Sequence, residues 1–241
     1  MYRDFQLRPD RDLTILIPAR AGSRRCPGKN TRMLGGKPLF LWAVDAARAA
    51  NAAHVIVSTD DLVVKAWLGY TYLFSIHDRK PEHATDDAPD ILWVRDVLPM
   101  VDTPYLAICR PTSPFRTAST IRRAYAQFCG TPCHSLRAVE RVTNGHPGKM
   151  WVGDGRYIIP LMSGTREDGT PFHSAPTQSL PTIYKQNACL EIVHRWVIEQ
   201  TGTISGYQII PFFTHADEGA NIDTEADFEA AVRLISARKA E

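Results

Sequence analysis

Residues 17–30 read Ile17-Pro18-Ala19-Arg20-Ala21-Gly22-Ser23-Arg24-Arg25-Cys26-Pro27-Gly28-Lys29-Asn30 and follow a short apolar run that begins at Leu13. The apolar run predicts a buried strand, and the two glycines and two prolines predict that it ends in an irregular loop. Cationic and hydroxyl side chains crowd this loop. Because a strand that runs into a glycine-rich basic loop presents backbone N–H groups and cations together, the stretch predicts a phosphate site at the end of the first strand.

The loop matches neither of the two common nucleotide-binding motifs. Gly28-Lys29 is followed by Asn30 instead of Ser or Thr, and the spacing G-x-G-x-x-G is absent. A solvated basic loop without a ligand is the simpler interpretation of this composition. The position of the loop favours a binding site, since ligands of open α/β sheets bind at the carboxyl ends of the strands.

Length and charge limit the class of protein. The chain has 241 residues, enough for one domain with a full core, and a formal net charge of +2. We expect neither a nucleic-acid partner nor a membrane, since long Lys/Arg runs and span-length apolar stretches are absent. Residues 1–12 are too polar for a secretory signal. The five scattered cysteines predict free thiols in a cytoplasmic protein without a zinc site.

Apolar runs that alternate with helical patterns predict an α/β fold. Strands are expected at 13–17, 54–58, 72–76, 105–109, 188–194 and 207–213, and helices at 38–50, 60–68, 90–98, 117–129 and 224–239. Thr117 or Ser119 is expected to start the fourth helix, and Thr224 with Asp227 to form a capping box on the last. The repeated strand–helix order predicts a Rossmann-like, mostly parallel sheet flanked by helices.

Residues 141–182 interrupt this order within what we expect to be a single domain, 1–241. The segment is rich in Gly, Pro, Thr and Ser, and it is too long for an ordinary connection. Trp151, Tyr157, Ile158 and Ile159 favour packing over disorder. We therefore expect an inserted dimerisation arm, with a disordered loop as the alternative.

Two further motifs flank expected helices. Residues 110–116, Arg-Pro-Thr-Ser-Pro-Phe-Arg, follow the fourth strand and so fall on the same sheet edge as the first loop. Asp223 precedes the last helix, where it is either a cap or a ligand for Mg²⁺, which takes one or two carboxylates together with substrate phosphates. A plain strand-to-helix turn is the simpler interpretation of residues 110–116 when they are considered alone.

Together these motifs resemble those of CMP-sialic acid synthetases (acylneuraminate cytidylyltransferases). Residues 18–30 are similar to P-A-R-G-G-S-K-G-I-P-G-K-N, residues 110–116 to Q-P-T-S-P-L-R, and residues 222–228 to I-D-T-E-x-D-[FL]. Weaker similarities are V-I-V-S-T-D-D at residues 55–61, H-P-x-K at 146–149 and L-P-x-x-[YF]-R-x-N at 180–187. The matches keep the order of the family and cover about residues 13–235.

The resemblance implies a CTP-dependent cytidylyltransferase that uses Mg²⁺ and forms a homodimer. An acceptor oxygen would attack the α-phosphate of CTP, giving a CMP conjugate and pyrophosphate. Charge neutralisation and positioning suffice for such a transfer. The implied catalytic residues are Arg20, Lys29 and Asp223. The implied nucleotide-binding residues are Ala19, Arg20, Gly22, Ser23, Lys29, Asn30, Arg79, Lys80 and Asp87. The implied acceptor-binding residues are Arg25, Arg110, Thr112, Ser113, Lys149, Lys185 and Asn187, with Lys149 reaching in from the partner subunit as one option. The implied metal ligands are Asp223 and Asn221.

Departures from the family pattern concentrate on the acceptor side. There, Arg110 replaces a Gln and Glu191 replaces a Tyr. Elsewhere, Asn221 replaces a carboxylate on the metal side, and residues 87–91, at the base pocket, depart from D-x-A-S-S-I-D. A planar cation in place of Gln suits a carboxylate or phosphonate, so we expect a small anionic acceptor: a phosphonate acid or another eight- or nine-carbon keto acid. Alternatively, Arg110 pairs with a nearby carboxylate and the acceptor is a sialic-type sugar. A non-catalytic nucleotide-binding homologue and a different nucleotide, such as GTP, also remain open.

Overall fold

The computed structural model describes residues 8–71 and 75–240, which form two compact units. The larger unit comprises residues 1–138 and 187–241, and the smaller comprises residues 139–186. A seven-stranded sheet runs in the order β11-β7-β10-β6-β1-β4-β5. Its strands are β1 (Leu13–Pro18), β4 (His54–Thr59), β5 (Ser75–Asp78), β6 (Tyr105–Ile108), β7 (Ser135–Arg141), β10 (Tyr184–His194) and β11 (Ile209–Phe213).

Strand direction follows the expected pattern. β6, β1, β4 and β5 pair in parallel, whereas β10 runs antiparallel to β6. The mostly parallel α/β sheet predicted from the sequence is therefore confirmed. The third expected strand, 72–76, falls partly on residues 72–74, outside the described residues, and β5 begins at Ser75. β7 and the helix α6 (Arg195–Thr201) were not expected from the sequence.

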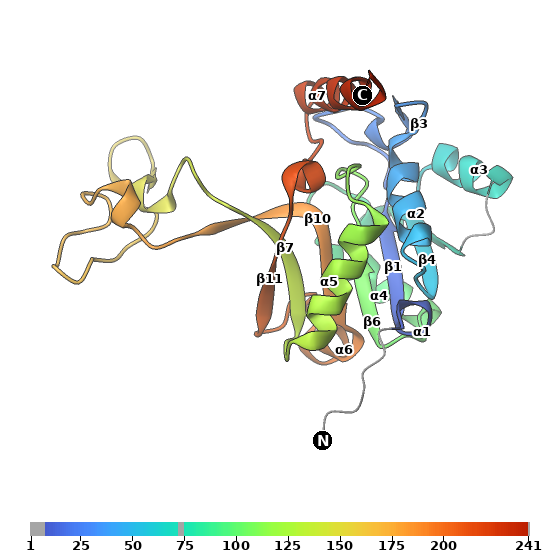
Figure 1. The fold of residues 1–241 in the computed structure, drawn as a ribbon, viewed down its shortest axis with the longest axis horizontal. Helices are drawn as coiled ribbons and strands as arrows, with labels where there is room; N and C mark the ends of the chain where they lie inside the picture. The colour runs from blue at the N-terminus through green and yellow to red at the C-terminus, as the bar shows by residue number, and fades with distance from the viewer. Residues whose placement is uncertain (1–7, 72–74, 241) are drawn as a thin grey trace. The chain divides into compact units, whose positions relative to one another are not determined.

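Helices cover both faces of the sheet, as Figure 1 shows. Ile15 and Ile17 of β1 face a core that contains buried residues of α2 (Leu39–Ala49), α3 (Leu62–Thr71) and α5 (Ala118–Gly130). Leu16 faces the opposite core, with α4 (Asp90–Val97) and α6. This alternation follows from the two-residue period of a strand. Since all of Leu13–Ile17 is fully buried, β1 is a continuous apolar run, as is typical of central parallel strands.

Hydrogen bonds fix the starts of two helices. The Thr117 hydroxyl accepts from the Thr120 backbone N–H at 3.2 Å, and this caps α5. At α7 (Glu225–Ala240), the Asp227 N–H donates to the Thr224 hydroxyl at 3.2 Å, and the Asp227 carboxylate accepts from the Thr224 N–H at 2.8 Å. Both expected capping residues are therefore confirmed.

The strand register gathers the loops at one edge of the sheet. Pro18 at the end of β1 lies opposite Ser58 of β4, and Leu16 lies opposite Ile108 at the end of β6. Because these strands are parallel, the segments that leave β1, β4, β5 and β6 emerge side by side. Short elements complete the larger unit: α1 (Pro9–Asp12), β2 (Met33–Leu34), β3 (Lys37–Pro38) and the 3₁₀ turns 29–31, 81–83, 98–100 and 216–219.

The smaller unit is built around a β-hairpin. Its strands are β8 (Trp151–Gly153) and β9 (Ile158–Pro160), which pair antiparallel. The Lys149 ammonium donates to the carbonyls of His173, at 2.8 Å, and Ala175, so it ties two turns of this unit together. The expectation that this insertion serves dimerisation stays a prediction. In the part of the chain that the structure describes, no helix is long and apolar enough to cross a membrane.

Candidate active site

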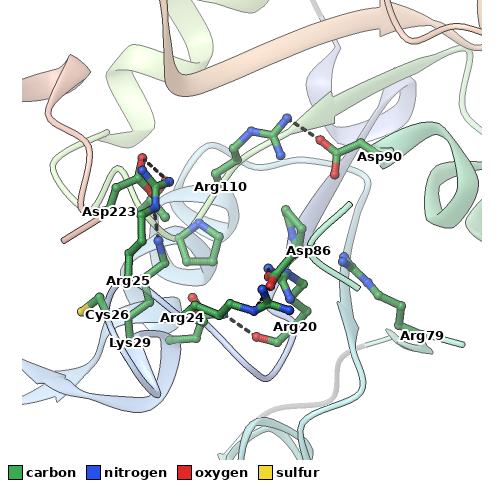
Figure 2. Close-up of a pocket in the computed structure, with 15 residues that line it drawn as sticks. Arg20, Arg24, Arg25, Cys26, Lys29, Arg79, Asp86, Asp90, Arg110 and Asp223 are labelled. Carbon is green, nitrogen blue, oxygen red and sulfur yellow. Dashed lines mark hydrogen bonds and ion pairs between the residues drawn. The ribbon is translucent and has the colours of Figure 1, made fainter. Parts of the chain in front are cut away.

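A cavity of about 400 Å³ lies at the edge of the sheet where the loops meet, and Figure 2 shows its charged side chains. Six cationic side chains and three carboxylates line it, and the loop after β1 supplies nearly half of its wall. The lining residues are Pro18, Arg20, Ser23, Arg24, Arg25, Cys26, Lys29, Asn30, Arg79, Asp86, Asp90, Arg110, Pro111, Thr112 and Asp223.

The loop after β1 is fastened at several points. Asn30 is buried, and its amide donates to the Arg20 carbonyl at 2.9 Å across the loop. The Thr59 hydroxyl donates to the Ala19 carbonyl at 2.6 Å, and the Ala21 N–H donates to Asp60 at 2.8 Å. Gly28, with φ of +62°, turns the chain into the short helix that carries Lys29 and Asn30. Asn30 therefore holds the loop shape from within.

Lys29 joins the loop to the segment that precedes α7. Its ammonium donates to the Ile222 carbonyl at 2.8 Å and pairs with the Asp223 carboxylate at 3.1 Å. The second oxygen of Asp223 lies 3.4 Å from Arg25. The Ile222 N–H in turn donates to the Thr112 carbonyl at 2.8 Å, so the loops after β1 and β6 and the start of α7 are linked at one residue.

Arg20 and Arg24 converge on one acidic residue. Both guanidinium groups pair with the Asp86 carboxylate, which belongs to the segment after β5, and Arg20 also donates to the Ala84 carbonyl at 2.9 Å. A hydrogen bond from Arg20 holds the pKa of Asp86 below its usual value. No local pattern singles out Asp86, because Arg20 lies 66 residues away along the chain.

Arg79 lies deeper than the loop cations. It is buried, its guanidinium stacks over the Trp93 ring at 4.7 Å, and its Nε donates to the Ser58 hydroxyl at 3.0 Å. The same hydroxyl lies 2.9 Å from Nδ1 of His77. Burial lowers the pKa of Arg79 to about 10, which leaves it cationic at neutral pH.

Arg110 is enclosed by carboxylates. Its Nη2 atom lies 2.7 Å from Asp90 at the start of α4 and 2.8 Å from Glu191 of β10. The other oxygen of Glu191 pairs with Arg137 of β7 at 2.5 Å. Burial would lower the pKa of Arg110, but Glu191 and Asp90 outweigh burial and raise it above its ordinary value. Of the two interpretations left open for Arg110, the structure shows the pairing with nearby carboxylates, and a role of Arg110 in acceptor binding stays a prediction.

Other residues that the sequence suggested are not among the residues that line the cavity. Lys80 pairs with Asp96 at 2.8 Å, and Lys185 lies 3.7 Å from Glu140. The Asn187 amide donates to the Thr214 hydroxyl at 3.0 Å. The cavity wall likewise leaves out Ala19, Gly22, Asp87, Ser113, Lys149 and Asn221, although Asn221 donates to Asp223 at 2.7 Å. Their roles in binding stay predictions.

Asp223 is the residue of the cavity that could bind a hard cation such as Mg²⁺. Asp223 is one carboxylate at the cavity wall, and among the described residues no three His, Cys, Asp or Glu side chains cluster as a protein-built metal site. A single carboxylate fits Mg²⁺ when substrate phosphates supply most of the other oxygens. Asp223, with the neighbouring Asn221 amide, therefore fits such a shared site.

This fold and cavity define an α/β nucleotidyltransferase, and comparisons with known proteins give the family. Residues 14–132 match the family model described as Cytidylyltransferase. The 3-deoxy-manno-octulosonate cytidylyltransferase of Methylococcus capsulatus is 54% identical, and the match covers 94% of this chain and 98% of that protein. The chain belongs to the cytidylyltransferase family.

Two further similarities are partial or structural. The CMP-N,N'-diacetyllegionaminic acid synthase of Legionella pneumophila is 38% identical over 118 residues. That match spans 46% of this chain and about half, 51%, of that protein. A solved structure of CMP:2-keto-3-deoxy-manno-octonic acid synthetase in complex with CTP superposes with a TM-score of 0.69 at 18% identity. It covers 94% of this chain and 99% of that one, which supports the fold.

Proposed function

We propose that this protein is a cytidylyltransferase that transfers CMP from CTP to an acidic sugar, with an eight-carbon 3-deoxy keto acid as the first candidate acceptor. The observation that carries the proposal is the cavity at the carboxyl edge of the sheet, where Arg20, Lys29 and Asp223 meet. The full-length similarity to a 3-deoxy-manno-octulosonate cytidylyltransferase supports this acceptor over a nine-carbon sialic acid.

The cations of the cavity suit a triphosphate. Arg20 and Arg24 share Asp86, and Lys29 and Arg25 share Asp223, so each carboxylate leaves one positive charge uncompensated. Phosphate oxygens that enter between them would take over these pairings. Because the charges are already oriented, they would stabilise the charge that develops on the α-phosphate without reorganisation.

The transfer itself needs few further groups. The acceptor hydroxyl attacks the α-phosphorus, the bond to the bridging oxygen of the β-phosphate breaks, and pyrophosphate leaves while the hydroxyl releases its proton. Lys29 and Arg20 would hold the phosphates in line. Mg²⁺, when bound at Asp223, would supply additional charge neutralisation for the leaving pyrophosphate.

The pairing of Arg110 changes the acceptor hypothesis made from the sequence. Arg24, Arg25 and Arg110 suggested an unusually anionic acceptor, but each of the three is paired with a protein carboxylate. Asp90 and Glu191 therefore neutralise Arg110, whereas Arg24 and Arg25 each share a single carboxylate with a second cation. A sugar acid with one carboxylate is the better match.

Release of pyrophosphate from CTP and Mg²⁺ with a panel of acceptors tests the proposal. We expect turnover with 3-deoxy-manno-octulosonate, and we expect slower turnover with N-acetylneuraminate. If CTP raises the melting temperature but no acceptor releases pyrophosphate, the enzymatic proposal is contradicted, and a nucleotide-binding homologue is supported. A preference for GTP in the same thermal-shift measurement would contradict the nucleotide assignment.

We also propose that the smaller unit, residues 139–186, mediates homodimer formation. Its hairpin exposes large apolar side chains, with Tyr157 70%, Ile158 59% and Ile159 67% exposed. Exposed apolar clusters of this kind are typical of interaction sites. Sedimentation velocity should show a dimer for the wild type and a monomer for Ile159→Glu, and a monomeric wild type would contradict this assignment.

A further inference from the structure

The charged cluster around Arg110 coincides with the positions where this chain departs from the sialic acid synthetase pattern. Arg110 stands in place of a Gln, Glu191 stands in place of a Tyr, and Asp90 lies in the altered segment 87–91. These three residues come from the β6–α5 turn, β10 and α4, and they make direct ion pairs in the fold. Because these residues contact one another, the effects of substitutions at them are expected to be coupled.

The cluster is buried toward Glu191 and open toward the cavity. The Glu191 side chain is 5% exposed and is held between Arg110 and Arg137, whereas Asp90 and Arg110 line the cavity. Asp90 is further fixed by the Trp93 indole, whose N–H donates to it at 2.7 Å. The charges of Arg110 and Arg137 are thus balanced by those of Asp90 and Glu191. The Arg110 side chain is held by Asp90 and by Glu191.

Both carboxylates take the same nitrogen of Arg110. Asp90 and Glu191 lie 2.7 and 2.8 Å from Nη2, and the structure gives Nη1 and Nε no partner among the described residues. A guanidinium grips an oxyanion with two parallel N–H bonds along the Nε–Nη2 edge or the Nη1–Nη2 edge. Each of these edges includes Nη2. Arg110 therefore retains only single donors for a ligand.

A hydroxyl without a partner belongs to a neighbouring residue of the same turn. Thr112 lines the cavity two residues after Arg110, and its Oγ1 atom is buried with no hydrogen-bond partner. Buried hydroxyls are nearly always satisfied, so this one is available to a ligand that reaches the side chain of Thr112. A single N–H of Arg110 and the Thr112 hydroxyl together suit one carboxylate oxygen or a sugar hydroxyl.

We propose that Asp90 and Glu191 determine acceptor selectivity by occupying Nη2 of Arg110, so that the site accepts a monocarboxylate sugar acid and discriminates against a phosphonate that needs a bidentate grip. This proposal rests on the proposed function, because it concerns the acceptor side of the same cavity. Asp90 and Glu191 act as positioning residues through Arg110.

A matched pair of ligands tests the proposal: 3-deoxy-manno-octulosonate and its analogue with a phosphonate in place of the carboxylate. Competitive inhibition by the analogue is compared with the KM of the sugar acid in the wild type, Asp90→Asn and Glu191→Gln. Releasing Nη2 is expected to shift the preference toward the phosphonate by about tenfold, the value of one added charge-assisted hydrogen bond, with the KM for CTP unchanged. Asp90→Asn keeps an oxygen for Trp93, which guards against loss of folding.

Glu218→Gln is the control variant, because Glu218 also forms a part-buried pair with an arginine, Arg123 at 2.5 Å, and lies outside the cavity wall. It should leave the preference unchanged. A wild type that binds the phosphonate more tightly, or folded Asp90 and Glu191 variants with the wild-type preference, would overturn the proposal. If no acceptor releases pyrophosphate, the proposed function fails, and thermal shifts by the two ligands with CTP present still report the preference.

Discussion

The two sides of the cavity hold their charges in different ways. On the outer side, Arg24 is 85% exposed and pairs with Asp86 in water. On the inner side, Glu191 is 5% exposed and shares its two oxygens between Arg110 and Arg137. Exposed ion pairs are weak and exchange partners easily, whereas a buried pair that loses one member leaves a costly bare charge. The outer cations are therefore suited to receive phosphates, and the inner ones to hold a fixed shape.

Lys29 should give the largest effect, because it stands between the loop and Asp223 and its side chain is only 13% exposed. Lys29→Ala is expected to lower kcat by about a hundredfold or more, through loss of one oriented cation at the phosphates. Steady-state pyrophosphate release measures it. Lys65→Ala, which removes a lysine of α3 that pairs with Asp78 of β5, is the control and should retain wild-type turnover. Equal losses in both variants would contradict a specific role for Lys29.

Glu191 tests whether the inner side is held together by its charges. Glu191→Gln should reduce the free energy of unfolding by about 3 kcal/mol, because two partly buried guanidinium groups lose their shared carboxylate. Urea unfolding measures this change. In Glu199→Gln, which breaks the exposed pair with Arg195 on α6, the loss should stay below about 0.5 kcal/mol. If the two variants lose equal stability, the contrast between buried and exposed pairs does not hold here.

Asp86 tests whether the outer side is exchangeable. Asp86→Asn releases Arg20 and Arg24 from their shared carboxylate, so the Kd for CTP should fall by about threefold, the scale of an exposed ion pair. The urea midpoint should not change. Isothermal titration at low salt gives the affinity, and the gain should shrink as salt is added. Weaker CTP binding in Asp86→Asn would show that Asp86 orients the arginines for the nucleotide instead of competing with it.

His77 gives the smallest expected effect, on the dependence of stability on pH. Burial lowers the pKa of His77 below the ordinary value of 6.5. As pH falls through 6.5, the unfolded chain binds a proton that folded His77 does not, so the contribution of His77 to stability is present above pH 6.5 and declines below it. Unfolding free energies of the wild type and His77→Asn should converge as pH is lowered. A constant difference across pH would contradict this assignment.

Local patterns in the sequence predicted much of the fold. The apolar run of β1, the caps at Thr117 and Thr224 and the gathering of loops at one sheet edge all depend on short stretches or on the strand–helix order. β7 and α6 escaped prediction. β7 has the sequence Ser-Leu-Arg-Ala-Val-Glu-Arg, in which the charged residues obscure a strand pattern. Arg137 is accommodated in this strand because it pairs with Glu191 of β10, a contact that no local pattern predicts.

The candidate site was predicted only in part, for a physical reason. Arg20, Lys29 and Asp223 stand in recognisable motifs, and the fold brings them to one cavity. The partners of the arginines could not be predicted, because Arg110 and Glu191 are 81 residues apart and no local signal specifies such a contact. Without those partners, Arg110 could be interpreted either as a cation for an anionic acceptor or as a member of an ion pair, so the sequence left both acceptor hypotheses open.

Ile222 gives the site an order of assembly. Its carbonyl accepts a hydrogen bond from Lys29, and its N–H donates to the Thr112 carbonyl. Ile222 therefore links the loops after β1 and β6, although it comes much later in the chain than either loop. During synthesis on the ribosome, the loops after β1 and β6 emerge long before residue 222. Until residue 222 has emerged, these loops lack the hydrogen bonds to the Ile222 backbone that link them. A nascent chain is thus expected to acquire nucleotide affinity in one step, only after residue 222 has been synthesised.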